Sequence, residues 1–294
     1  MRLVSLLPSA TEIVYALGLD DQLVGVTFEC DEPPRARREK VVVVGGRDTR
    51  EMTPADIDSY VKAQMADGAD LYTLHADALA GLEPDLILTQ DLCRVCALPS
   101  GQVSDALDYL GCRAEVVSLD PYTLDQVLGT IVEVGSRAGV PERARVVVAG
   151  LRQRLDAVAS AVAGRPRPRV AVVEWVDPPF TAGHWVPDLV TAAGGVPVAA
   201  RPGARSGQTT WDEFDVAEPD LVLVTPCGFH LDGAADQART VAAALPGVPV
   251  WALDGDALIV RPGPRLIDGV ETIAGILHPD SIPGPDPRAA RRAA

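Results

Sequence analysis

The sequence predicts an α/β protein made of two lobes, each built on a mainly parallel sheet, with one long helix joining them. Short apolar segments alternate with helical ones in both halves of the chain, which is the pattern of parallel βαβ units. Between the halves, apolar residues keep a helical spacing from Pro141 to Val162. A helix of about 22 residues spans roughly 33 Å, which is long for a crossover inside one lobe.

The first half begins with an apolar strand at 3–7 and a helix after it. Ser9 and Glu12 have the spacing of a capping box, which places Ser9 at the N-cap. Gly18 suits the position just after the end of that helix. Further strands are expected at 23–27, 41–44, 86–89 and 114–119, and helices at 72–79 and 103–110.

A helix at 124–138 precedes the long helix, and Pro141 suits the first turn of the long one. The second half is expected to contain strands at 170–173, 221–224 and 250–253 and helices at 185–193 and 265–277. The predicted domains are an N-terminal lobe at 1–121, linking helices at 122–164, a C-terminal lobe at 165–280 and a tail at 281–294. The tail is rich in Pro, Arg and Ala, so we expect it to be disordered.

Composition narrows the class of protein. A length of 294 residues suits about two domains, and 47% hydrophobic residues can fill two cores. The net charge of −15 argues against nucleic-acid binding. No apolar run is long enough for insertion in a membrane. No export signal is apparent, so a cytoplasmic location is expected, and a periplasmic or membrane-anchored one only if a leader has been trimmed.

Cysteines follow several predicted strands. Cys30, Cys93, Cys96 and Cys227 all lie at or near the carboxyl end of a strand, where open α/β sheets bind ligands. Reduced thiols favour metal or redox roles over structural disulfides. Cys93 and Cys96 have the spacing to grip one metal ion or to cycle as a disulfide, with Cys30, Cys227 or His184 as further metal ligands. Inert packing is the alternative, because cysteine is often buried.

Aromatic residues gather in one loop of the second half. Glu174 and Trp175 precede this loop, and Phe180, His184 and Trp185 lie within it. Aromatic walls suit a large planar or apolar ligand, and an imidazole nitrogen of His184 can reach a metal. The alternative is a hydrophobic cluster beneath a Pro-stiffened loop.

Other polar residues admit two interpretations. Glu29 either orients a ligand or faces water, and Arg261 either clamps an anionic group or pairs with an Asp. Gly228 permits close approach of the backbone to a ligand. Residues expected to be structural are Cys112, His75, His230 and His278.

Several motifs together resemble the iron–siderophore and cobalamin substrate-binding proteins of ABC transporters. The opening segment SLLPSATEI at 5–13, the segment EPDLIL at 83–88 and the long central helix carry the likeness. Shorter segments resemble a branch of this superfamily that is described as cobalamin-binding proteins. They are ECD at 29–31, CRVC at 93–96, EW at 174–175, GHW at 183–185, PCGF at 226–229 and RPGPR at 261–265.

The resemblance implies two Rossmann-like lobes joined by a stiff helix, a ligand clamped between the lobes and an ABC permease as partner. The expected ligand-binding residues are Pro8, Ser9, Glu29, Cys30, Gln90, Glu174, Trp175, Phe180, His184, Trp185, Gly228, Phe229 and Arg261. Two departures from transport members are expected: no export signal or lipid anchor is apparent, and the chain carries a set of cysteines that such members do not usually need.

The leading hypothesis is a binding protein for cobalamin, another corrinoid or a similar small-molecule metal chelate. The alternative is a cytosolic metalloprotein that holds zinc, iron or an iron–sulfur cluster through Cys30, Cys93, Cys96, Cys227 and His184. That protein is an enzyme if Glu29 or Glu174 acts as acid or base. A third option is a redox dithiol at Cys93 and Cys96.

Overall fold

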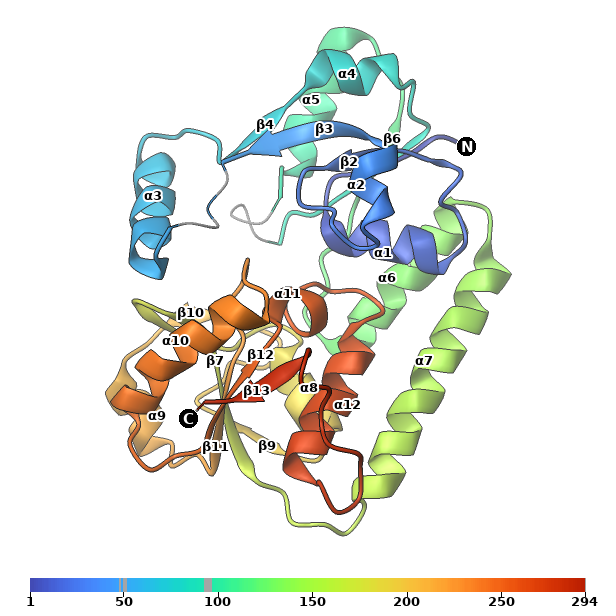
Figure 1. Cartoon of the computed structure of the whole chain (residues 1–294). Coiled ribbons are helices and arrows are strands. Elements are labelled where there is room, and N and C mark those ends of the chain that lie inside the picture. Colours follow the sequence, from blue (N-terminus) through green and yellow to red (C-terminus); the bar gives the residue numbers. More distant parts are fainter. Residues whose placement is uncertain (48, 50–51, 93–96, 294) are drawn as a thin grey trace. The chain divides into compact units, whose positions relative to one another are not determined.

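The chain folds into two compact α/β units. The computed structural model describes residues 1–47, 49, 52–92 and 97–293 (Figure 1). The N-terminal unit comprises Met1–Glu51, Ser59–Pro121 and Leu128–Val148, and the C-terminal unit comprises Met52–Asp58, Tyr122–Val127 and Ala149–Ala294. The linking segment predicted at 122–164 contributes residues to both units.

A six-stranded sheet forms the N-terminal unit. Its order is β4-β3-β2-β1-β5-β6, parallel except for β4. The elements along this part of the chain are β1 (Leu3–Ser5), α1 (Pro8–Ala16), β2 (Leu23–Thr27), α2 (Arg35–Glu39), β3 (Val41–Gly46), α3 (Pro54–Ala66), β4 (Tyr72–Leu74), α4 (Ala76–Gly81), β5 (Leu86–Thr89), α5 (Ser100–Leu110) and β6 (Glu115–Ser118). The first residues of α3, 54–58, are assigned to the C-terminal unit. The direction of strand order reverses between β1 and β5, which is where doubly wound sheets open a ligand crevice.

The N-terminal core lies between this sheet and helices α4 and α5. Val4, Val43 and Ile87 from the strands pack against Leu79 of α4 and Val103 of α5, all without exposed surface. The strands read as continuous apolar runs because both faces of a parallel sheet are covered. This packing fixes the carboxyl ends of β1, β2 and β5 relative to one another.

A seven-stranded sheet forms the C-terminal unit. Its order is β10-β8-β7-β11-β12-β13, with β9 beside β7. The elements are β7 (Arg169–Val176), β8 (Pro179–Thr181), α8 (Val186–Ala192), β9 (Val196–Val198), β10 (Gly207–Gln208), α9 (Trp211–Val216), β11 (Leu221–Val224), α10 (Leu231–Ala244), β12 (Val250–Leu253), α11 (Gly255–Leu258), α12 (Leu266–Leu277) and β13 (Ala290–Arg292). The central strands β7, β11 and β12 are parallel, as are β7 and β9.

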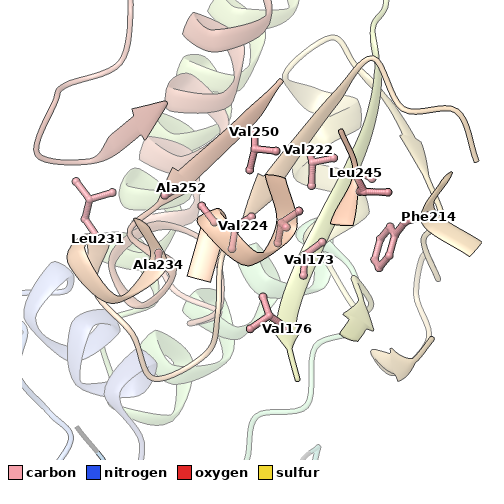
Figure 2. Packing of buried hydrophobic residues seen from close by; sticks show 13 residues of the cluster. Val173, Val176, Phe214, Val222, Val224, Leu231, Ala234, Leu245, Val250 and Ala252 are labelled. Atoms are coloured by element: carbon pink, nitrogen blue, oxygen red, sulfur yellow. The ribbon is translucent and has the colours of Figure 1, made fainter. Parts of the chain in front are cut away.

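Figure 2 shows the hydrophobic cluster on one face of this sheet. Strand residues Val173, Val222 and Val250 pack there against Leu231 of α10 and Phe214 of α9. Phe214 is the largest fully buried side chain among the described residues. The cluster holds α9 and α10 against the sheet and so positions the loops that follow β7, β11 and β12.

Helices α6 (Leu124–Arg137) and α7 (Pro141–Val162) connect the units, and the long helix expected from the sequence is confirmed. Within the C-terminal unit, Arg154 of α7 donates hydrogen bonds to Glu271 and Asp268 of α12. Arg154 Nε lies 2.8 Å from Glu271 Oε1, and Arg154 Nη2 lies 2.6 Å from Glu271 Oε2. The hydrogen bond with Glu271 raises the pKa of the Arg154 guanidinium. This network fastens α7 to the C-terminal unit.

Replacement of Arg154 by methionine is expected to lower the free energy of unfolding of the C-terminal unit by about 1 kcal/mol. The loss is small because the side chains of Arg154, Asp268 and Glu271 remain 39%, 44% and 40% exposed, so that water weakens their attraction. The loss is measured by denaturant unfolding and should shrink in 1 M salt, which screens exposed charges. Arg239→Met is the control, because Arg239 pairs with Asp236 at a more exposed site. Equal losses in both variants would contradict a special role for Arg154.

Two sequence-based expectations in the N-terminal unit are wrong. Residues 72–79 do not form one helix, because Tyr72–Leu74 is strand β4 and pairs with β3, and the helix starts only at Ala76. The capping box is absent too, since α1 begins at Pro8 with Leu7 as its N-cap and no side-chain cap. Proline suits the first helical turn, so Ser9 falls inside the helix.

The tail also differs from the expectation of disorder over 281–294. Residues 290–292 form β13, which pairs antiparallel with β12, and Ala290 is buried. Backbone hydrogen bonds to an existing strand order a segment whose composition alone predicts none. The helices α3, α9 and α10 were not expected from the sequence either. Within the described residues, no helix has the length and apolar character to span a membrane.

Candidate functional site

The carboxyl edge of the C-terminal sheet gathers most of the predicted ligand-binding residues of that unit. Glu174 and Trp175 lie near the carboxyl end of β7, and the 225–230 loop follows β11. Asp254 and Asp256 follow β12, which is the neighbour of β11. Because β7, β11 and β12 are adjacent and parallel, their carboxyl ends meet at one edge.

Trp175 and Phe229 form an aromatic pair at this edge. Their ring centroids lie 5.8 Å apart with an interplanar angle of 56°. Trp175 Nε1 donates to the carbonyl oxygen of Asp177 at 3.1 Å, which fixes the indole. Phe180 on β8 stands opposite Trp175 in the strand register. All three aromatic side chains are half-buried, so this edge offers an apolar wall with surface left for a ligand.

Glu174 holds the next loop in place. Its Oε1 accepts a hydrogen bond from the backbone N–H of Gly183 at 3.1 Å, and its Oε2 accepts one from the hydroxyl of Ser206. A side chain at Gly183 would collide with the backbone of Ser206, since its Cβ would lie 2.2 Å from that nitrogen. Glu174 therefore acts through loop geometry, and glycine is needed beside it.

The ring of His184 contacts two other aromatic rings in tilted geometry. Its ring lies 5.6 Å from Tyr122 and 5.5 Å from Trp185, centroid to centroid. Burial, and then the charge of Arg205, lower the pKa of His184, which favours the neutral imidazole. Its Nε2 is buried and has no hydrogen-bond partner within the described ranges.

Trp185 and Arg261 are tied to neighbours inside the unit. Trp185 is only 5% exposed, and its Nε1 donates to the carbonyl oxygen of Ile259 at 2.8 Å. Arg261 Nη2 lies 3.3 Å from Asp256 Oδ2 with both side chains nearly buried. Asp256 Oδ1 in turn accepts from the backbone N–H of Gly228 at 2.9 Å. These contacts brace the loop that carries Phe229.

His230 and Asp254 form a pair, whereas the sequence predicted a structural role for His230. His230 Nδ1 lies 3.1 Å from Asp254 Oδ1. The two residues follow neighbouring strands, β11 and β12, at the same edge of the sheet. A signal was present in the sequence, because each residue comes within a few positions of a predicted strand end.

The N-terminal unit places its predicted residues at the ends of β1, β2 and β5. Ser9 and Gln90 are buried, whereas Pro8 and Glu29 are partly exposed. The hydroxyl of Tyr72 donates to Glu29 Oε1 at 3.5 Å. Tyr72 also lies 6.3 Å from Phe28, ring to ring. This second aromatic pair was not predicted, because 72–79 had been assigned to a helix.

The predicted metal ligands are not brought together in the part of the chain that the structure describes. Cys30 is fully buried in the N-terminal unit and accepts a hydrogen bond from the Thr11 hydroxyl at 3.0 Å. Cys227 is exposed in the C-terminal unit, as is part of His184. Cys93 and Cys96 lie outside the described residues. Among the residues described, no three His, Cys, Asp or Glu side chains form a group able to hold a metal ion.

The sequence matches a known protein family over most of its length. The profile of the family described as "Periplasmic binding protein" matches residues 3–253. The vitamin B12-binding protein of Vibrio cholerae is 27% identical over 282 residues, which cover 94% of this chain and 88% of that protein. An uncharacterized ABC transporter substrate-binding lipoprotein, YvrC of Bacillus subtilis, is 26% identical over 296 residues. The alignment covers 96% of this chain and 81% of that protein.

Solved structures share the fold. The periplasmic vitamin B12-binding protein BtuF of Vibrio cholerae superposes with a TM-score of 0.64 at 26% identity, over 94% of this chain and 96% of that one. A periplasmic heme-binding protein from Pseudomonas aeruginosa gives a TM-score of 0.70 at 23% identity, over 100% and 98% of the two chains. The second likeness shows the fold alone.

These matches correct one expectation from the sequence. The cytoplasmic location is contradicted, because the family is that of periplasmic binding proteins and one relative is a substrate-binding lipoprotein. The predicted likeness to substrate-binding proteins of ABC transporters is confirmed, and so is the two-lobed α/β fold. With its profile matched over residues 3–253, the chain belongs to the periplasmic binding protein family.

Proposed function

We propose that this chain captures a corrinoid of the cobalamin class and delivers it to an ABC permease. The observation that carries the proposal is the aromatic pair of Trp175 and Phe229 at the carboxyl edge of the C-terminal sheet. Support for the ligand class comes from the vitamin B12-binding relatives, which align over nearly the whole chain.

The aromatic pair has the chemistry to bind the flat, largely apolar face of a corrin ring. Indole and phenyl rings supply large rigid surfaces with few rotatable bonds, so little entropy is lost on binding. The indole of Trp175 is already anchored through Asp177, and the Phe229 loop is braced by Asp256. A wall prepared in this way spends less binding energy on ordering itself.

A polar group of the N-terminal unit suits the amide-bearing rim of a corrinoid. Glu29 of the N-terminal unit is partly exposed near the end of β2, next to the rings of Phe28 and Tyr72. Pockets for small molecules combine apolar walls with a few polar groups that orient the ligand. We assign the carboxyl edge of each sheet to ligand contact on these grounds.

The alternative of a metalloprotein that uses Cys30, Cys227 and His184 has less support. These groups form no three-ligand cluster in the described ranges, and the Cys30 thiol is engaged by Thr11. Heme is a second planar chelate to compare, because some structures of the same fold are named heme-binding proteins. At 22% and 23% identity, these two structures are less similar to this chain than the vitamin B12-binding protein of Vibrio cholerae, which is 27% identical.

Titration of the purified full chain with cyanocobalamin tests the proposal. We expect saturable heat of binding and a dissociation constant of about 1 µM or tighter, equivalent to roughly 8 kcal/mol. Hemin is titrated in parallel and is expected to bind more weakly. Absence of cobalamin binding at about 100 µM would reject the corrinoid proposal. Tight binding of hemin alone would reassign the ligand.

A further inference from the structure

The pair of His230 and Asp254 is built by the sheet beside the aromatic wall. His230 directly follows Phe229 in the loop after β11, and Asp254 directly follows β12. His230 Nδ1 lies 3.1 Å from Asp254 Oδ1 and 3.2 Å from Oδ2. Since β11 and β12 are hydrogen-bonded neighbours, their ladder sets the separation of the two side chains.

Asp254 is held in one position as a hydrogen-bond acceptor. Its side chain is only 15% exposed, and Oδ1 also accepts from the backbone N–H of Ala257 at 2.9 Å, which caps α11. A fixed carboxylate next to Nδ1 selects the imidazole tautomer with its proton on Nδ1 and its lone pair on Nε2.

His230 itself remains 62% exposed. An imidazole that binds a metal usually donates its other ring N–H to a carboxylate, which fixes the ring and raises its basicity as a ligand. His230 has this arrangement, and it adjoins the aromatic pair of Phe229 and Trp175. On the basis of the function proposed above, we propose that His230 Nε2 is an axial ligand to the metal ion at the centre of the captured chelate.

The step is a simple ligand exchange. The Nε2 lone pair forms a cobalt–nitrogen bond while the water on cobalt(III) leaves with the electron pair of the cobalt–oxygen bond. No electron is transferred to or from the metal, and the Nδ1 proton stays between His230 and Asp254. Only chelates with an exchangeable axial position gain this bond, so the site selects aquocobalamin over methylcobalamin.

The test compares these two cobalamins on the full chain and on His230→Gln. Wild type is expected to shift the visible bands of aquocobalamin and to bind it more tightly than methylcobalamin. His230→Gln should lose the band shift and at least about tenfold in affinity for aquocobalamin, with binding of methylcobalamin unchanged. Asp254→Asn should weaken aquocobalamin binding on the order of 10–100-fold, as loss of the partner of a ligating imidazole does.

Two control variants separate this role from others. Cys227→Ser should keep the band shift, because the nearby exposed thiol is not the ligand. His75→Gln should also keep it, since His75 is an exposed histidine of the N-terminal unit at the start of α4. A shift that persists in His230→Gln, or disappears in Cys227→Ser, would overturn the assignment. If methylcobalamin binds but aquocobalamin shows no shift, the axial ligand alone is rejected; if neither binds, the corrinoid function falls with it.

Discussion

Replacement of Phe214 by alanine is expected to lower the free energy of unfolding of the C-terminal unit by about 3–5 kcal/mol. Phe214 has no exposed surface and packs from α9 into the cluster that includes Val173 and Val222 (Figure 2). Its ring also lies 5.8 Å from that of Trp211. Alanine removes the ring from a close-packed interior and leaves a cavity that rigid neighbouring strands cannot fill, so dispersion contacts are lost as well.

Tryptophan fluorescence isolates this effect from the other unit. All four tryptophans, at positions 175, 185, 211 and 251, belong to the C-terminal unit, so their emission during denaturant unfolding reports on that unit. Val216→Ala is the matched control, because Val216 lies on the same helix but is 81% exposed, and should change stability by less than about 0.5 kcal/mol. A Phe214→Ala loss below about 1 kcal/mol would contradict the described packing.

Replacement of Trp175 by alanine is expected to weaken cobalamin binding by about 1–3 kcal/mol, roughly 5–150-fold. The indole supplies the larger ring of the aromatic wall and is held in place by Asp177. Alanine removes both the apolar surface and its preorganisation. The fold should persist, since Trp175 lies at the end of β7 and is only half-buried.

Calorimetric titration with cyanocobalamin measures this loss. Trp175→Phe should retain most of the affinity because it keeps a ring at the site. The double variant with Phe229→Ala should lose less than the sum of the single losses, because the two rings contact each other. Tyr109→Ala serves as control, since this ring on α5 is 90% exposed. Equal affinities of Trp175→Ala and Tyr109→Ala would remove the aromatic wall from the binding site.

Local signals in the sequence were sufficient for the central elements. Pro141 and Gly164 bracket a helical apolar pattern, and α7 begins and ends within the predicted bounds. Strands such as 221–224 were correct because a buried parallel strand is a short apolar run between turn residues. The same kind of pattern is present in α10, where Leu231, Ala234 and Ala238 recur at helical spacing, although no helix was predicted there.

Elements that depend on a remote partner were not predictable in this way. Residues Tyr72 and Leu74 suit a helix or a strand equally, and only pairing with β3 makes them β4. Residues 290–292 gain their order from β12 alone. In each case the backbone hydrogen bonds come from a segment distant in sequence, so local propensity carries little information about the outcome.

The candidate site also has a part that the sequence predicts and a part that depends on the folded structure. Trp175, Phe180 and His184 were predicted as a group because they are close in sequence. That Glu174 holds Gly183, and that Trp185 is bound to Ile259, required the folded loop. The ring contact between Tyr122 and His184 had no counterpart in the sequence pattern. The proposed cysteine set gained no support among the described residues, since Cys30 is packed inside its unit.

The order of apolar strands, helices and turn residues was enough to determine the fold class, the family likeness and the long helix, because each rests on patterns a few residues long. The tertiary structure decided which side chains meet at the edge of each sheet, including His230 with Asp254 from neighbouring strands. Such contacts depend on strand order and register, which are set by packing over the whole unit. The local sequence indicates where single strands end, but it does not say which residues meet there.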